Sequence, residues 1–221
     1  MIDTVIFDLD GTLLYTLEDL TDSTNAALEH FGFEKRTVSE VRSFVGNGVK
    51  KLIERAIPDG AENPVFEECL GFFKSHYEKN MYNKTKPYDG VLELLKKLED
   101  SGIKTAVVSN KFDEAVKQLC ARYFPQNFCC VVGESEKVRK KPAPDSVLKV
   151  MANLNSLAQN TIYVGDSEVD IQTAQNAKIP CVSVDWGYKD TDFLLKNGAE
   201  IVISKPSELV DFIKQDFVKN L

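Results

Sequence analysis

Two carboxylates near the start of the chain, Asp8 and Asp10, have the residue type and spacing for metal or proton chemistry. The run before them, residues 4–7, holds β-branched and aromatic side chains, and Gly11 follows, which predicts a buried strand that ends in a turn. Alternation along a strand puts both carboxylates on one face, where they repel each other unless a cation or a shared proton holds them. Oxygen ligands favour Mg²⁺. For these residues alone, an acidic turn that caps a strand is the alternative.

A second polar pair, Ser109 and Asn110, follows an apolar run at residues 104–109. A hydroxyl and backbone N–H groups at a helix entrance suit the oxygens of a phosphate group. Serine is also a preferred N-cap residue, so the alternative is that Ser109 only caps the next helix.

Two further acids, Asp166 and Asp170, follow an apolar run at residues 161–165. Ligands of open α/β sheets bind outside the carboxyl ends of the strands, so we expect Asp166 to face Asp8. Asp170 comes one helical turn later, and we expect it to contact the metal through water or to orient a lysine. Compensation of the helix dipole is the alternative, which explains Glu168 well and Asp166 poorly.

One lysine, Lys141, stands directly before Pro142 in a proline-containing stretch. The proline restricts the backbone of the residue before it, so Lys141 is held with little freedom. A fixed cation near several carboxylates balances their charge and binds phosphate. The other basic residues of this run, within 137–140, are interpreted as solvated surface.

The elements that position these residues follow an alternating pattern from about residue 87 onward. Apolar runs alternate with helical patterns, which predicts an α/β fold with an open, doubly wound parallel sheet and helices on both faces. A helix is predicted at 90–100, where apolar residues form one stripe before Gly102. The expected strands are 104–109, 127–132, 161–165, 179–184 and 201–204.

Residues 16–86 contain no convincing strand, and their amphipathic stretches predict a separate helical unit. The expected helices are 17–31, 38–44, 49–57 and 65–82. This unit would be an α-helical cap inserted after the first strand of a core formed by residues 1–15 and 87–221. The two linkers, near Tyr15 and Pro87, would act as hinges.

Charge and composition disfavour nucleic-acid and membrane partners. The formal charge of −7 disfavours nonspecific nucleic-acid binding. No apolar run approaches the roughly 20 residues that a membrane-spanning helix needs, and no leader precedes the first strand, so we expect a cytoplasmic protein without a membrane partner. The five cysteines are irregularly spaced, as in reduced proteins, and Cys129 and Cys130 are interpreted as buried strand residues. Both a monomer and a homodimer remain open.

The polar sites together resemble the four ordered motifs of the haloacid dehalogenase superfamily. The resemblance covers essentially the whole chain, and the helical insertion stands where that family's first type of cap domain does. Within the superfamily the chain looks most like the phosphoglycolate phosphatase group, because of similar stretches at residues 44–48, 184–188 and 197–200.

The resemblance implies catalytic roles for the first two acids. Asp8 would attack phosphorus and form an aspartyl phosphate. Asp10 would protonate the leaving oxygen and then activate water. Mg²⁺ would be held by Asp8, the backbone carbonyl of Asp10, and Asp166. The substrate would be a small phosphorylated metabolite.

Other residues would support this reaction, again by resemblance. Lys141 and Ser109, with Asn110 beside it, would bind the phosphoryl oxygens, and Asp170 would be a supporting acid. Thr12 would help Asp10 keep its position and contact the phosphate. The turn of Gly46, Asn47 and Gly48 would be a cap loop that reaches toward the substrate, with a plain helix-entry turn as the alternative.

One position departs from the family pattern, since Tyr15 and Thr16 replace an Asp-Ser pair, which puts the hinge contacts and substrate choice in doubt. A sugar-phosphate mutase or an inorganic pyrophosphatase on the same core is the alternative function, and a phospho-switch without turnover is a more distant one. The two histidines, His30 and His76, are interpreted as surface or packing residues of the cap, which disfavours a Ser-His-Asp hydrolase.

Overall fold

A six-stranded sheet forms the centre of the protein in a computed structural model that describes residues 1–135 and 138–214. Among the described residues the neighbouring strands of this sheet pair in parallel, and the order is β5-β4-β1-β6-β7-β8. The predicted α/β class with a parallel sheet is therefore confirmed. The strands are β1 (Thr4–Phe7), β4 (Lys104–Phe112), β5 (Cys130–Glu134), β6 (Thr161–Gly165), β7 (Cys181–Val184) and β8 (Val202–Ile203).

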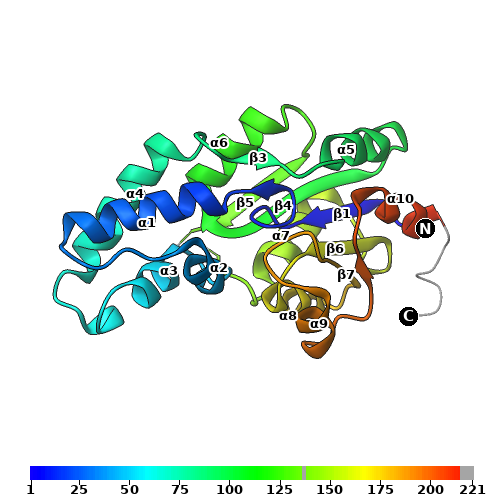
Figure 1. Ribbon diagram of the computed structural model, residues 1–221. Coiled ribbons are helices and arrows are strands. Elements are labelled where there is room, and N and C mark those ends of the chain that lie inside the picture. Colours follow the sequence, from blue (N-terminus) through cyan, green and yellow to red (C-terminus); the bar gives the residue numbers. More distant parts are fainter. Residues whose placement is uncertain (136–137, 215–221) are drawn as a thin grey trace. The chain divides into compact units, whose positions relative to one another are not determined.

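The helices of this unit alternate with the strands along the chain and lie on both sides of the sheet (Figure 1). One face packs Ile6, Val108 and Tyr163 of the sheet against Val147 of α7 and Ala174 of α8. The helices are α5 (Val91–Asp100), α6 (Asp113–Tyr123), α7 (Asp145–Leu154), α8 (Glu168–Ala177), α9 (Thr191–Lys196) and α10 (Pro206–Lys214), with a short 3-10 helix at Ala158–Asn160.

The strand order places β1 between β4 and β6, near the middle of the sheet. All four residues of β1 are buried, as is typical of a parallel strand that is covered on both faces. Phe7 pairs with Val107 on one side and with Val164 on the other. The residues that come after Phe7, Val107 and Val164 therefore lie close together at one edge of the sheet.

The chain divides into two compact units. The first contains residues 1–14 and the described residues from 87 onward, and the second is Tyr15–Lys86. The second unit is helical, with α1 packed against α4. Its helices are α1 (Leu17–His30), α2 (Val38–Phe44), α3 (Val49–Ala56) and α4 (Phe66–Asn80), with a short 3-10 helix at Gly60–Glu62. Where the chain passes between the units, β2 (Leu14–Tyr15) pairs with β3 (Lys86–Pro87).

Four expected strands have different bounds in the structure: β7 begins at Cys181 instead of residue 179, β8 covers only Val202–Ile203 of 201–204, and β4 and β5 differ more. β4 continues beyond residue 109 to Phe112, because the pairing with β5 shifts register after Val108 and the chain stays extended. β5 begins at Cys130 instead of residue 127. The interpretation of Cys129 and Cys130 as buried is wrong: Cys129 is exposed and Cys130 is half-buried. β5 is an edge strand, so one side of it lacks a neighbouring strand.

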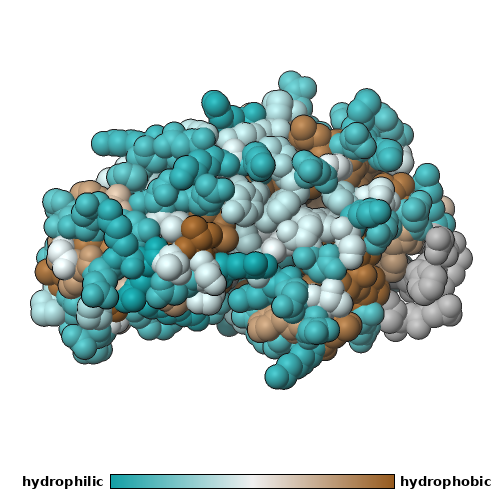
Figure 2. Space-filling view, in the orientation of Figure 1, coloured by the Kyte–Doolittle hydropathy of each residue, from teal (hydrophilic) through white to brown (hydrophobic). Residues whose placement is uncertain are grey.

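The surface in view is mostly hydrophilic, with apolar side chains in small separate groups (Figure 2). Among the described residues, none of the helices combines the length and the apolar character needed to cross a membrane.

Candidate active site

Three buried aspartates gather at the carboxyl end of the sheet. Asp8 follows β1, Asp166 follows β6, and Asp170 lies in the first turn of α8. Each offers a carboxylate oxygen, and these oxygens all lie within 4.8 Å of one another. The expectation that Asp166 faces Asp8 therefore agrees with the geometry.

A lysine lies among these acids. The Nζ atom of Lys141 is 2.7 Å from Asp170 Oδ1 and 2.9 Å from Asp8 Oδ1, and its side chain is only 3% exposed. Asp170 Oδ2 in turn accepts hydrogen bonds from the backbone N–H and the hydroxyl of Ser167, at 3.1 and 2.6 Å. Asp170 is thus in direct contact with Lys141, as one of the two roles expected for it requires, and the role itself stays a prediction.

The charges of this group do not balance. Three carboxylates against one ammonium leave two excess negative charges when all are ionised. Burial raises the pKa of Asp8 to about 7, against the opposing effect of Lys141. Burial, together with the charges of Asp170 and Asp8, also raises the pKa of Asp166 well above its usual range. Burial alone would lower the pKa of Lys141, but Asp170 and Asp8 raise it well above its ordinary value. Bound protons or a cation would each relieve the repulsion among these acids.

The donor set fits a hard divalent cation such as Mg²⁺. Among the described residues, Asp8 Oδ1 is buried and accepts no hydrogen bond, although the ammonium of Lys141 lies close by. Asp166 accepts hydrogen bonds from two neutral donors of the described part of the chain, Thr12 Oγ1 at 3.3 Å and the backbone N–H of Tyr188 at 2.7 Å. Oxygen ligands of this kind suit Mg²⁺. Asp170 fits the ion less well, because Lys141 and Ser167 already take both of its oxygens.

Three glycines pack their backbone directly against the carboxylates of Asp166 and Asp170. A Cβ atom on Gly11, whose φ is +87°, would lie 2.3 Å from Asp166 Oδ2. A Cβ on Gly187 would lie 2.4 Å from both Asp166 Cβ and the carbonyl oxygen of Gly11. A Cβ on Gly165 would lie 2.3 Å from Asp170 Cγ. Real Cβ atoms do not approach so closely, so the carboxylates require glycine at these positions.

The carboxylate of Asp10 has a lysine of its own. Lys111 Nζ donates to Asp10 Oδ2 at 2.8 Å, and the two side chains are 2% and 12% exposed. Sequence reasoning assigned no role to Lys111. A signal was present, because Lys111 stands two residues after Ser109, in the same stretch that follows an apolar run.

Ser109 and Asn110 lie inside β4, so the interpretation of Ser109 as a helix N-cap is wrong. Helix α6 begins at Asp113, and Phe112 is its N-cap residue. The buried Ser109 hydroxyl accepts the backbone N–H of Lys111 at 3.3 Å. The amide of Asn110 contacts the backbone of Lys141 twice: its Nδ2 donates to the carbonyl at 3.0 Å, and its Oδ1 accepts the N–H at 2.8 Å. Asn110 thus positions the backbone that carries the lysine.

A stretch late in the chain closes the site from another side. The backbone N–H of Tyr188 reaches Asp166, and the indole N–H of Trp186 donates to the carbonyl of Thr12 at 3.0 Å. The hydroxyl of Thr12 donates to Asp166 Oδ1 at 3.3 Å. The expected role of Thr12 in holding Asp10 in position stays a prediction. In the sequence this late stretch stands out only through the family resemblance of residues 184–188.

The remaining candidates belong to the helical unit, which is described by itself. Gly46, Asn47 and Gly48 form the turn between α2 and α3, and Gly48 is the N-cap residue of α3. A role of this turn toward a substrate stays a prediction. His30 stacks on Phe72 at a centroid distance of 4.4 Å, as expected of a packing residue. Tyr15 belongs to β2, and the buried Thr16 is the N-cap residue of α1.

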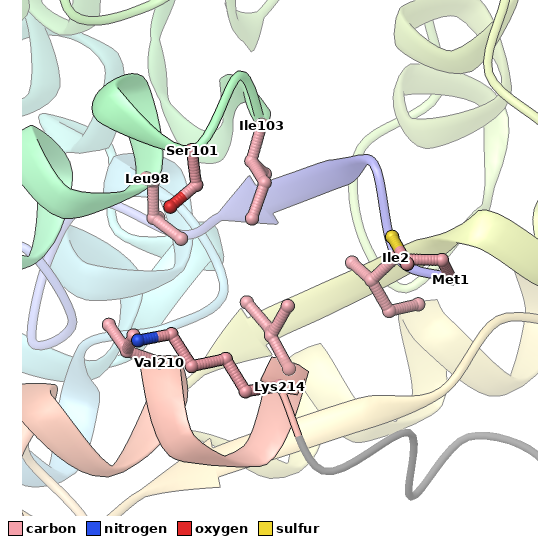
Figure 3. Close-up of a pocket in the computed structure, with 8 residues that line it drawn as sticks. Met1, Ile2, Leu98, Ser101, Ile103, Val210 and Lys214 are labelled. Atoms are coloured by element: carbon pink, nitrogen blue, oxygen red, sulfur yellow. The ribbon is translucent and has the colours of Figure 1, made fainter.

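A separate cavity of about 270 Å³ lies at the other end of the sheet, where Met1 and Ile2 precede β1 and Ile103 precedes β4 (Figure 3). Its lining is largely apolar, with Ser101 and Lys214 as polar members. The acids that follow the same strands lie at the opposite edge, so this cavity is not part of the aspartate cluster.

Comparison with known proteins agrees with this arrangement. The profile of the haloacid dehalogenase-like hydrolase family matches residues 5–184. A phosphoglycolate phosphatase from Aquifex aeolicus is 31% identical over 97% of this chain and 98% of its own. Another from Mesorhizobium japonicum is 34% identical over 84% of each chain.

A solved structure shows the same fold. It is a proposed phosphoglycolate phosphatase from Lactobacillus delbrueckii subsp. bulgaricus, with a TM-score of 0.91 and 35% identity over 96% of this chain and 98% of that one. The strand order, the four polar sites at one sheet edge and these likenesses agree with one another. The chain therefore belongs to the haloacid dehalogenase-like hydrolase family, in its phosphoglycolate phosphatase-like group of phosphoric monoester hydrolases.

Proposed function

We propose that this protein is a Mg²⁺-dependent phosphatase that hydrolyses a small phosphomonoester through an aspartyl phosphate on Asp8. The observation that carries the proposal is the buried group of Asp8, Asp166 and Asp170 around Lys141. Asp10, which follows Asp8 by two residues, is paired with Lys111. Together these residues combine a nucleophile, a cation for phosphoryl oxygens, and a second carboxylate for proton transfer.

In the first half-reaction a carboxylate oxygen of Asp8 attacks the phosphorus of the substrate. The bond between phosphorus and the ester oxygen breaks, and protonated Asp10 gives its proton to that oxygen, so the alcohol leaves neutral. Lys141 and Ser109 stabilise the charge on the transferring oxygens. The product on the enzyme is a mixed anhydride between Asp8 and the phosphoryl group.

In the second half-reaction water attacks the phosphorus of the aspartyl phosphate. Asp10, now ionised, takes a proton from this water, and the bond between Asp8 and phosphorus breaks. Inorganic phosphate leaves and Asp10 is again protonated. One residue thus serves first as acid and then as base.

The metal would be held by Asp8, Asp166 and the backbone carbonyl of Asp10. When bound, Mg²⁺ supplies positive charge that draws the anionic phosphoryl group toward an anionic nucleophile. The two excess negative charges of the aspartate group and the buried Asp8 Oδ1 support this assignment.

The substrate that we propose is a small, phosphoglycolate-like metabolite. The names of the relatives from Aquifex aeolicus and Mesorhizobium japonicum support this choice. We further propose that residues 16–86 form a cap that closes over the core, and that the turn of Gly46, Asn47 and Gly48 contributes to selection of the substrate. The helical character of this unit and its separation from the core support a cap.

The test is a phosphate-release screen with Mg²⁺ over phosphoglycolate, other small phosphomonoesters, hexose phosphates and pyrophosphate. We expect the highest kcat/KM for a small phosphomonoester and no turnover after chelation. Release from pyrophosphate alone would assign the chain to the pyrophosphatases. Transfer of the phosphoryl group between sugar positions without release of phosphate would assign it to the mutases.

A further inference from the structure

Tyr163 contacts the ammonium group of Lys141 from inside the core. Lys141 Nζ donates to Tyr163 Oη at 2.9 Å, and the tyrosine hydroxyl donates to the carbonyl of Val108 at 3.1 Å. Tyr163 is fully buried in β6, and Val108 precedes Ser109 in β4. The hydroxyl therefore connects three elements of the site: the lysine, the strand that leads to Asp166, and the strand that carries Ser109.

The contacts of Lys141 show why such a connection matters. An ammonium has three N–H donors. One goes to Tyr163 at 2.9 Å and one to Asp170 at 2.7 Å, while Asp8 Oδ1 lies 2.9 Å away without forming a hydrogen bond. Two hydrogen bonds thus hold the ammonium in place beside Asp8.

We propose that Tyr163 is a positioning residue that aims Lys141 at the phosphoryl group on Asp8. This inference rests on the function proposed above, and it assigns a role to a residue that does not itself touch the substrate. A lysine stem is flexible and has many rotamers, so a single partner at Asp170 would leave the ammonium free to swing around that bond. The rigid phenol removes this freedom because its ring is packed in the core and its hydroxyl is held by Val108.

The neutral character of Tyr163 suits this role. Burial raises the pKa of its phenol well above the ordinary value, so the group remains a hydroxyl that can accept from Lys141 and donate to Val108 at once. A carboxylate in place of the phenol would instead add a fourth negative charge to a group that already holds three carboxylates.

The test compares Tyr163→Phe with Tyr77→Phe. Tyr77 is also fully buried, but it lies in α4 of the helical unit, so its variant controls for the loss of a buried tyrosine hydroxyl. For Tyr163→Phe we expect kcat to fall about 10- to 100-fold, with KM changed less than about threefold. The reason is that a displaced Lys141 ammonium stabilises the charge of the transition state less well, while substrate binding depends on it less. Tyr77→Phe should retain the wild-type kcat. A Tyr163→Phe enzyme with kcat within about twofold of wild type overturns the proposal.

A double-mutant cycle asks whether the hydroxyl acts through Lys141. Its readout is the affinity of the Mg²⁺-loaded protein for orthovanadate, measured by calorimetry. We expect Tyr163→Phe to weaken orthovanadate binding about tenfold in the wild-type background and to have no further effect in Lys141→Met. An equal loss in both backgrounds shows that Tyr163 does not act through the lysine and contradicts the proposal.

The cycle also separates this proposal from the function on which it rests. If the wild-type protein released no phosphate from any monoester, the proposed function would fail, yet weaker orthovanadate binding by Tyr163→Phe would still support the positioning role. Absence of orthovanadate binding by the wild-type protein would overturn the positioning role as well.

A crystal structure of Tyr163→Phe gives a readout that needs no Lys141 variant. We expect the ammonium in more than one position, and an unmoved, single position contradicts the proposal.

Discussion

Lys111 Nζ lies 2.8 Å from Asp10 Oδ2, in a pair whose side chains are 2% and 12% exposed. Asp8, only two residues earlier, has a different lysine, Lys141, at 2.9 Å. Each of the two neighbouring acids therefore lies beside a different lysine, although the charge of Asp10 still helps to raise the pKa of Asp8. A pair of carboxylates that share one ion would respond alike to mutation, whereas these two should respond differently.

The pair of Lys111 and Asp10 can be tested by its stability. Replacement of Lys111 by Met leaves the nearly buried Asp10 carboxylate without this cation, so we expect the free energy of unfolding to fall by about 2–4 kcal/mol. The double variant Lys111→Met with Asp10→Asn should recover much of this loss, because it removes both charges. Chemical denaturation measures each value.

The control for that cycle is an exposed pair on α5. Lys96 and Asp100 lie 3.6 Å apart with side chains 74% and 63% exposed. Lys96→Met should cost less than about 0.5 kcal/mol, because water already screens the pair. If Lys111→Met lowered the free energy of unfolding no more than Lys96→Met does, the Lys111–Asp10 pair would not contribute to stability.

Variants of the two acids should stop the reaction at different points. Asp8→Asn removes the nucleophile, so we expect no phosphate release and no covalent phosphate. Asp10→Asn keeps the nucleophile but loses the base for the second step. With an aryl phosphate, whose leaving group needs little protonation, this variant should accumulate the aspartyl phosphate, which intact-protein mass spectrometry detects as one added phosphoryl group. Accumulation in Asp8→Asn instead would reverse the assigned roles.

Much of the fold follows from local pattern. The apolar runs before Asp8 and Asp166 are strands that end where the acids begin, and parallel pairing brings the two ends together. The helix predicted at 90–100 is α5, since its apolar stripe and the following Gly102 are both local signals. Features determined within a few residues of the chain could therefore be predicted from the sequence.

Other features depend on partners that are distant in sequence. Lys111 was missed because its partner Asp10 is 101 residues away. The end of β4 was placed too early because its extension depends on a register shift against β5. Cys129 is exposed and lies just before β5, and apolar composition does not reveal that β5 begins only at Cys130 or that it is an edge strand. The same composition occurs in central and in edge strands.

The raised pKa of Asp8 predicts how stability depends on pH. The value is about 7 in the folded protein against 3.8 ordinarily, mainly because of burial. Between these values the folded state binds a proton that the unfolded state has lost, so the contribution of Asp8 to stability is present below about pH 4 and is lost as the pH rises to about 7. In metal-free buffer, wild type should therefore lose stability relative to Asp8→Asn between about pH 4 and pH 7. A pH-independent difference between the two would contradict the raised pKa.

Addition of Mg²⁺ should offset this loss. The cation binds the ionised carboxylates, so the rise in melting temperature on addition of Mg²⁺ should be larger at about pH 8 than at about pH 5. Asp166→Asn should reduce the rise at both pH values. Asp3→Asn is a control, since Asp3 precedes β1 at the other end of the sheet, and it should respond to Mg²⁺ as wild type does. An equal response from Asp166→Asn would remove Asp166 from the metal site.

The close approach of Gly187 to Asp166 gives a test of the backbone around the site. A Cβ at residue 187 would lie 2.4 Å from Asp166 Cβ and from the backbone carbonyl of Gly11, and neither can move without shifting the loop that carries the acids. Gly187→Ala should therefore lower both the melting temperature and the stabilisation by Mg²⁺, measured by thermal denaturation with and without the ion. Gly71→Ala is the matched control, because a Cβ there meets nothing within 4 Å and the residue lies within α4. That substitution should raise stability by about 0.5–1 kcal/mol, as alanine favours a helix over glycine. Equal, harmless behaviour of the two variants would show that the contact between Gly187 and Asp166 does not constrain the site.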